Sequence, residues 1–149
     1  MAHHDLLPTG YEPLDAEHDR LADTVERLLG EVNGGRIAGV RTALRELLSL
    51  AAAHFAHEER LMADTGYSRR TQHKEAHDLF LGDVSTFARE LGGRRVPPKF
   101  RRWAVGRLQT WVRFHVAAND VALGAFLSAR HRQCRASSPA ELADAARAR

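Results

Sequence analysis

Histidines and carboxylates recur in this 149-residue chain at spacings that place them on one face of a helix. Side chains four positions apart on an α-helix lie one above the other, so both can point at one centre. His54 and Glu58 have this spacing, and so do His73 and His77. Imidazole and carboxylate are common ligands for iron, and the set contains no thiolate, so it indicates a metal site. The candidate ligands are His18, His54, Glu58, His73, His77, His115 and Asp120.

The candidate ligands also fall within the apolar stripes of their segments. A single His-x-x-x-Glu spacing is typical of a solvated pair on a helix surface. Here His73 and His77 lead directly into Phe80 and Val84 at helical spacing, and His54 and Glu58 flank Phe55. Apolar stripes face the core, where an unpaired imidazole or carboxylate carries a desolvation cost. Binding to a common metal would offset that desolvation cost for the whole set of side chains.

Four segments with helical periodicity are separated by short runs of Gly, Asn and Pro. The expected helices cover residues 15–32, 37–63, 68–91 and 99–129. Such short connections force antiparallel neighbours, so the sequence predicts an all-α, up-down-up-down antiparallel four-helix bundle behind an irregular N-terminal arm. We expect one domain, the bundle at residues 1–135, and a C-terminal extension at 136–149. In that extension Ser138-Pro139-Ala140-Glu141 is typical of the start of a short helix.

Charge, apolar runs and cysteine content indicate which partners and which cellular compartment to expect. The charge of +3 is spread over the chain without a stacking motif, so we expect no nucleic-acid partner. No apolar run has the length of a membrane span, and the first residues lack the apolar stretch of a signal peptide. Cys134 is the only cysteine, which favours a reducing compartment, the cytoplasm. We expect a monomer, and the sequence leaves any protein partner open.

The spacing between His115 and Asp120 does not fit a regular helix. Five residues correspond to about 500° of rotation, which leaves these side chains about 140° apart. A π-type turn brings positions i and i+5 into line. The sequence therefore predicts a π-bulge or widening between Phe114 and Asp120. In the alternative, Asp120 caps a surface turn and Asn119 faces the core.

The number of candidate ligands favours two metals. Seven ligands are more than one octahedral ion can bind and fewer than two such ions need. The number of ligands suffices for two metals if both carboxylates and one solvent-derived oxygen bridge them. Five histidines, divided three and two, then leave one metal with an open position, as binding of a small diatomic molecule requires. A site with few carboxylates favours binding over oxidation chemistry.

Several runs resemble the bacterial hemerythrins, in particular the single-domain members. The run His54-Phe55-Ala56-His57-Glu58-Glu59-Arg60-Leu61-Met62 is similar to the family signature, and Gly66-Tyr67 precedes the His73-x-x-x-His77 pair as in the family. Trp111-x-x-x-His115-x-x-x-x-Asp120 and Asp15-x-x-His18 match its remaining helices. The resemblance covers about residues 15–127 and implies two iron ions, oxo- or hydroxo-bridged, with O2 as the ligand.

The resemblance also implies roles for individual residues. His73, His77 and His115 would hold the six-coordinate iron, and His18 and His54 the five-coordinate iron that takes up O2. Glu58 and Asp120 would bridge the two. We expect the wall of the O2 pocket to consist of Phe55, Trp111, Val112 and Val116.

This chain departs from the family pattern at a few positions near the site. Val112 stands where Leu is frequent, and Glu17 stands where Gln is frequent. His57 is one position out of the ligand phase, so we expect it to face solvent.

Three functions remain open at this point. The leading one is reversible O2 binding for storage, delivery or sensing, without enzymatic activity. A di-iron enzyme that acts on peroxide or nitric oxide would use the same ligands. A signalling module would need an output domain, and 149 residues leave little room for one.

Overall fold

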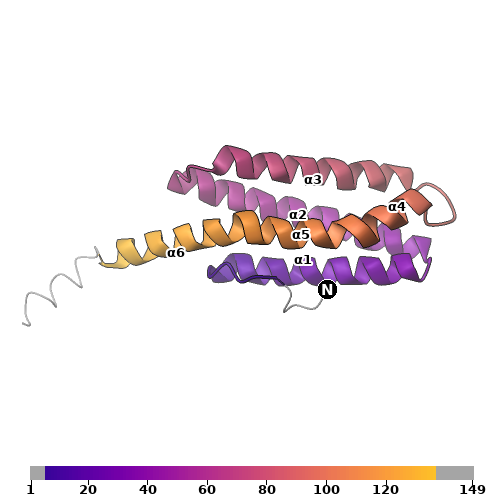
Figure 1. Ribbon diagram of the computed structural model, residues 1–149, viewed down its shortest axis with the longest axis horizontal. Coiled ribbons are helices and arrows are strands. Elements are labelled where there is room, and N and C mark those ends of the chain that lie inside the picture. Colours follow the sequence, from indigo (N-terminus) through magenta and orange to yellow (C-terminus); the bar gives the residue numbers. More distant parts are fainter. Residues whose placement is uncertain (1–5, 137–149) are drawn as a thin grey trace, which may run out of the picture.

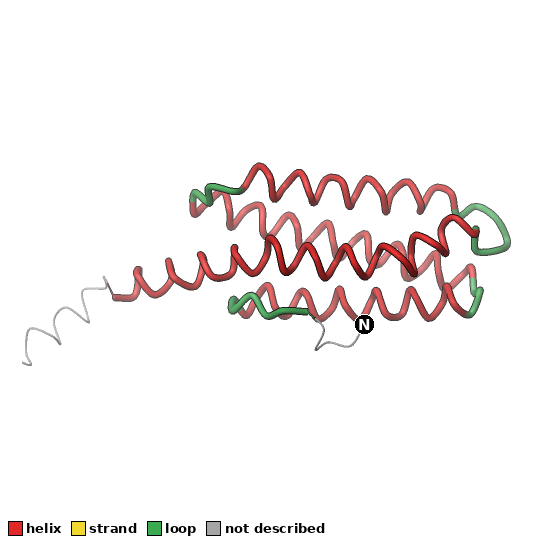
Figure 2. Tube along the Cα trace, in the orientation of Figure 1, coloured by secondary structure: helices red, strands yellow, loops and turns green. Residues whose placement is uncertain are grey.

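The computed structural model describes residues 6–136, which fold as an antiparallel helical bundle (Figure 1). Three continuous helices come first: α1 (Glu12–Asn33), α2 (Ile37–Thr65) and α3 (Arg70–Glu90). The fourth column is an unbroken series of helical segments: α4 (Pro98–Trp103), η2 (Ala104–Leu108), α5 (Gln109–His115), η3 (Val116–Asp120) and α6 (Val121–Ala136). The connections are short and alternate between the two ends of the bundle (Figure 2).

This arrangement confirms the predicted all-α fold and its up-down-up-down order, with helix bounds close to those expected. The largest difference is at the end of the fourth column, which continues to Ala136 instead of stopping near Ala129. Residues 131–135 are exposed and mostly polar, so this part of α6 stays helical without packing against the bundle and projects beyond it (Figure 1). The expected helix start at Ser138-Pro139-Ala140-Glu141 lies outside the described residues. In residues 6–136, no helix has both the length and the apolar character needed to cross a bilayer.

The turn after α2 shows how the sequence ends a helix here. Gly66 adopts the left-handed conformation with φ of 67°, which a residue with a side chain rarely does. The backbone N–H of Gly66 donates to the carbonyl of Ala63, and that of Tyr67 donates to the carbonyl of Met62. These bonds satisfy carbonyls that the helix end leaves free, and they set the reversal into α3.

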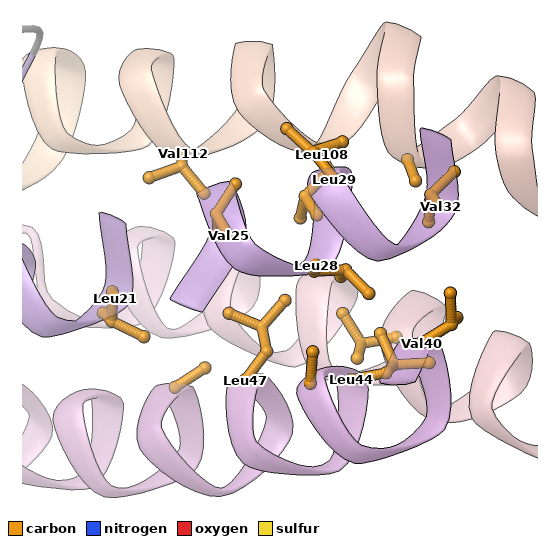
Figure 3. Close-up of a cluster of buried hydrophobic side chains, with 14 of the residues drawn as sticks. Leu21, Val25, Leu28, Leu29, Val32, Val40, Leu44, Leu47, Leu108 and Val112 are labelled. Carbon is orange, nitrogen blue, oxygen red and sulfur yellow. The ribbon is translucent and has the colours of Figure 1, made fainter. Parts of the chain in front are cut away.

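The apolar core is divided into two clusters along the bundle axis. The larger cluster joins all four helical columns, with residues such as Val25, Leu47 and Leu108 packed together (Figure 3). The smaller cluster consists of Leu14, Met62, Leu123 and Leu127. On α1 and the fourth column the candidate metal ligands lie between the residues of one cluster and those of the other, and on α2 Glu58 does so while His54 directly precedes Phe55 of the larger cluster. The polar layer is therefore closed from water by apolar side chains at both ends.

Candidate metal centre

The structure brings all the candidate ligands into one buried layer. Each helical column contributes: α1 one histidine, α2 a histidine and a glutamate, α3 two histidines, and the fourth column a histidine and an aspartate. Their exposed fractions run from 0% for Glu58 and His77 to 5% for His115. The set whose positions were predicted from spacing thus meets in the bundle interior: His18, His54, Glu58, His73, His77, His115 and Asp120.

The layer contains two groups of side chains with the geometry of metal sites. One group consists of Glu58, His73, His77 and His115, and the other of His18, His54, Glu58 and Asp120. Within each group the possible ligand atoms all lie within 4.8 Å of one another. One group contains three histidines and the other contains two, which is the division expected from the number of ligands.

The two carboxylates lie between the groups. The Oε2 atom of Glu58 is 3.1 Å from Nε2 of His77 and 3.6 Å from Nε2 of His54, which belong to different groups. The Oδ1 atom of Asp120 is 3.2 Å from Nε2 of His115, and its Oδ2 atom is 3.2 Å from Nε2 of His18. Each carboxylate therefore reaches imidazoles of both groups, as a bridging ligand must.

The residues fit a pair of metal ions because several of their buried polar atoms make no hydrogen bond. Both carboxylate oxygens of Glu58, both of Asp120, and Nε2 of His77 are buried without a hydrogen bond. Leaving one buried polar group unsatisfied costs about 1–3 kcal/mol, so this many together favour a bound cation as their common partner. The donor set of imidazole and carboxylate suits iron.

A π-helical turn brings the last two ligands into line. The segment η3 covers Val116–Asp120, which confirms the widening predicted from the spacing of His115 and Asp120. Asp120 is 1% exposed and points into the layer, whereas the side-chain amide of Asn119 lies 3.3 Å from the outer Nδ1 atom of His115. The alternative, with Asn119 facing the core and Asp120 at the surface, is therefore wrong.

In the metal-free protein, Glu58, Asp120 and His73 hold each other in charged forms. Burial opposes ionisation of Glu58, but the imidazoles of His73 and His77 outweigh it and lower the pKa of Glu58 to about 2. Burial also opposes protonation of His73, yet the neighbouring Asp120 and Glu58 raise its pKa to about 9. The pKa of Asp120 falls well below its usual value, because the imidazole contacts, foremost that of His115, outweigh its burial. Metal binding would replace the proton that His73 carries.

A second layer of contacts orients the imidazole rings. Nδ1 of His54 lies 2.8 Å from Oε2 of Glu17, and Nδ1 of His77 lies 3.2 Å from Oε1 of Glu59. Outer contacts of this kind fix which ring nitrogen faces a metal. The sequence did not reveal Glu17 and Glu59 in this role, because their contacts depend on how α1 and α3 pack against α2. His57, expected to face solvent, is three-quarters buried and lies 2.9 Å from Oε1 of Glu17.

A small apolar cavity lies beside the metal layer, on the side of the group with two histidines. Its volume is about 20 Å³, and its lining includes both His18 and His54 of that group, but His115 alone of the three histidines in the other group. All of the residues expected in the pocket wall line it: Phe55, Trp111, Val112 and Val116. Leu6 of the N-terminal arm also lines it, a residue that the sequence did not single out.

The N-terminal arm is held where Leu6 meets this cavity. Asp15 accepts hydrogen bonds from the backbone N–H and the hydroxyl of Thr9, at 2.7 and 2.8 Å. The hydroxyl of Ser128 on α6 donates to the carbonyl of Gly10 at 2.8 Å. A Cβ atom at Gly124 would lie 2.4 Å from the carbonyl oxygen of Thr9, so only glycine lets the arm approach α6 this closely.

Comparison with known proteins defines the class. Residues 9–127 match the family model described as the hemerythrin HHE cation binding domain. A bacteriohemerythrin of Pseudomonas aeruginosa is 32% identical over 80% of this chain and 78% of its own length. A myohemerythrin of Riftia pachyptila is 26% identical over 70% of this chain and 82% of its own.

Solved structures agree on the fold. The crystal structure of a wild-type hemerythrin superposes with a TM-score of 0.69, at 24% identity, over 78% of this chain and 88% of that one. At this identity the likeness concerns the architecture. Taken with the match to the family model, it leaves one conclusion: the chain belongs to the hemerythrin family.

Proposed function

We propose that this protein binds O2 reversibly at a non-haem di-iron centre. His73, His77 and His115 would hold one iron, His18 and His54 the other, and Glu58 and Asp120 would bridge them. The bound irons would supply the electrons that convert O2 into a bound, reduced form and recover them on release. The names of the relatives, bacteriohemerythrin and myohemerythrin, support this class of function.

The observation that carries the proposal is the position of the cavity. It is lined by both histidines of the two-histidine group, which would leave a metal position open, and by only His115 of the three-histidine group. A volume of about 20 Å³ admits little more than one water-sized molecule, which suits a diatomic ligand. Apart from the metal-layer side chains, its lining is apolar, including Leu21, Leu47 and Phe80.

The chain's own residues have three tasks in this function. The apolar lining excludes water and solutes that would strip the bound ligand. Trp111 stacks on the ring of His115 with centroids 4.5 Å apart, and Phe55 stacks on His77 at 3.9 Å, so neither imidazole can tilt freely. The two apolar clusters keep the polar layer within a rigid bundle.

Optical spectra test the proposal. The protein is reconstituted with iron, reduced under argon, exposed to O2 and degassed through several cycles. We expect an oxo-bridged di-iron absorption that forms with O2, disappears on degassing and returns with undiminished amplitude. One-way conversion to the oxidised form in the first cycle would overturn reversible binding.

An enzyme that acts on peroxide or nitric oxide is the second candidate, because molecules of that size also fit the cavity. The same reconstituted protein separates the two functions. Catalytic consumption of either substrate over many turnovers, with no reversible oxygenated form, would favour the enzyme.

A further inference from the structure

The carboxylate of Glu17 lies between a candidate iron ligand and a second histidine. Its Oε2 atom is 2.8 Å from Nδ1 of His54, and its Oε1 atom is 2.9 Å from Nδ1 of His57. Glu17 belongs to α1 and both histidines to α2, so the contact crosses the interface of the two helices. The side chains of Glu17 and His57 are 26% and 25% exposed, whereas that of His54 is 2% exposed.

The chemistry of these groups fixes the tautomer of His54. An ionised carboxylate only accepts hydrogen bonds, so the Nδ1 atoms of both histidines must carry the hydrogens. The Nε2 atom of His54 then has a free lone pair. This atom points into the metal layer, 3.2 Å from Nε2 of His18.

A glutamine at this position could not make both contacts in the same way. Its amide oxygen can accept from one Nδ1–H, but its NH2 group donates and would face a second donor. The combination of Glu17 with His57 therefore allows two N–H groups to be accepted by one anion. His57 in turn holds the carboxylate in place for His54.

We propose that Glu17 is a positioning residue that sets the donor strength of His54 toward the iron next to the cavity. A carboxylate that accepts the Nδ1–H of a metal-bound imidazole raises the basicity of that ligand. A stronger donor stabilises the ferric state of its iron and weakens the attraction of that iron for a further anion. The inference rests on the di-iron centre of the proposed function, and it concerns only one of the two irons.

The chain offers a matched comparison on the other metal group. Glu59 contacts Nδ1 of His77 at 3.2 Å, but its second oxygen lies 3.6 Å from the ammonium of Lys74. Glu59→Gln therefore removes the equivalent charge from beside His77, a histidine of the other group that does not line the cavity. Glu75→Gln, at an exposed position of α3, controls for the loss of one surface charge.

The test compares these variants as reconstituted proteins by their midpoint potential and by the affinity of the diferric form for azide. We expect Glu17→Gln to raise the midpoint potential by about 59 mV, equivalent to a tenfold change for one electron. We expect the same variant to bind azide about tenfold more tightly, within the range typical of such outer ligands. Glu59→Gln should change the azide affinity much less, and Glu75→Gln should change neither quantity.

Further variants separate charge from geometry. Glu17→Ala removes the charge and the contact, so we also expect a loss of about 10-fold or more in Co²⁺ affinity. His57→Ala should shift the midpoint potential in the same direction as Glu17→Gln, and the double variant should show no larger shift than Glu17→Gln alone.

If Glu17→Gln keeps the wild-type potential and azide affinity while wild-type protein oxygenates reversibly, the inference is wrong and the proposed function stands. If wild-type protein binds no iron pair, the proposed function fails first.

Discussion

At the scale of single residues, the candidate ligands could be predicted because helical spacing alone places them. His73 and His77 share a face whatever their helix packs against, and both are buried in the structure. The contacts of Glu17 and Glu59 could not be predicted in this way. They join different helices, so they depend on the rotation of each helix about its axis, which a single sequence does not give.

Val112 offers a test of the cavity. It is 8% exposed and lines the cavity of about 20 Å³, so a Val112→Leu substitution adds a methylene where little space remains. We expect slower autoxidation of the oxygenated protein, on the order of tenfold, or about 1.4 kcal/mol in the barrier. The extra packing should cost about 1–3 kcal/mol of folding stability. Val105→Leu, at a half-exposed position of the same column, is the control, and equal autoxidation rates in both variants would show that Val112 does not limit access.

The charges in the metal-free layer predict how stability depends on pH. The pKa of His73 is raised from 6.5 to about 9, so its contribution is full below pH 6.5 and is lost as the pH rises through 9. The pKa of Glu58 is lowered from 4.5 to about 2, so its contribution is full above pH 4.5 and is lost as the pH falls through 2. Urea unfolding of the metal-free protein should therefore give the highest free energy of unfolding between pH 4.5 and pH 6.5, where both contributions are full. A free energy that stays constant from pH 6.5 to pH 9 would contradict the charged state of His73.

At the scale of helices, the sequence predicted one of the two π-helical segments. The segment η3 was expected because a ligand pair five residues apart requires it, whereas η2 at Ala104–Leu108 carries no such pair. The docking of the N-terminal arm was also missed. It depends on a close approach between Thr9 and Gly124, which are far apart in the sequence.

Exchange of two side chains tests the role of η3. The double variant Asn119→Asp, Asp120→Asn keeps composition and charge but moves the carboxylate from the metal layer to the position beside Nδ1 of His115. We expect the purified double variant to hold fewer metal ions per chain than the wild type. Equal metal content in the two proteins would mean that the π-helical turn does not serve to place the carboxylate.

Two glycine substitutions of opposite effect test the docking of the arm. Gly82→Ala, at an exposed helical position with open space around it, should stabilise the protein by about 1 kcal/mol. Gly124→Ala gains the same helix propensity but would force Thr9 away from α6, so we expect it to destabilise by about 1–3 kcal/mol. Thermal unfolding of both variants gives the signs, and stabilisation by Gly124→Ala would show that the arm does not depend on this contact.

At the scale of the whole molecule, the bundle encloses a polar layer between two apolar clusters. Seven buried polar side chains stand in this layer where apolar side chains would otherwise pack. In the metal-free protein several of their polar atoms make no hydrogen bond. Metal binding to the folded state alone would then stabilise the fold. The sequence predicted this plan because the ligands lie in phase with the apolar stripes on every helix.

The number of metal ions bound by each chain tests the central claim most directly. Metal-free protein is titrated with Fe²⁺ under argon, and bound iron and melting temperature are measured together. Because the layer contains two ligand groups, bound iron and the rise in melting temperature should both level off at two ions per chain. Glu58→Ala, which removes the side chain shared by both groups, should lower that number. Saturation of the wild-type protein at one ion per chain, or full binding of two ions by Glu58→Ala, would contradict the bridged pair.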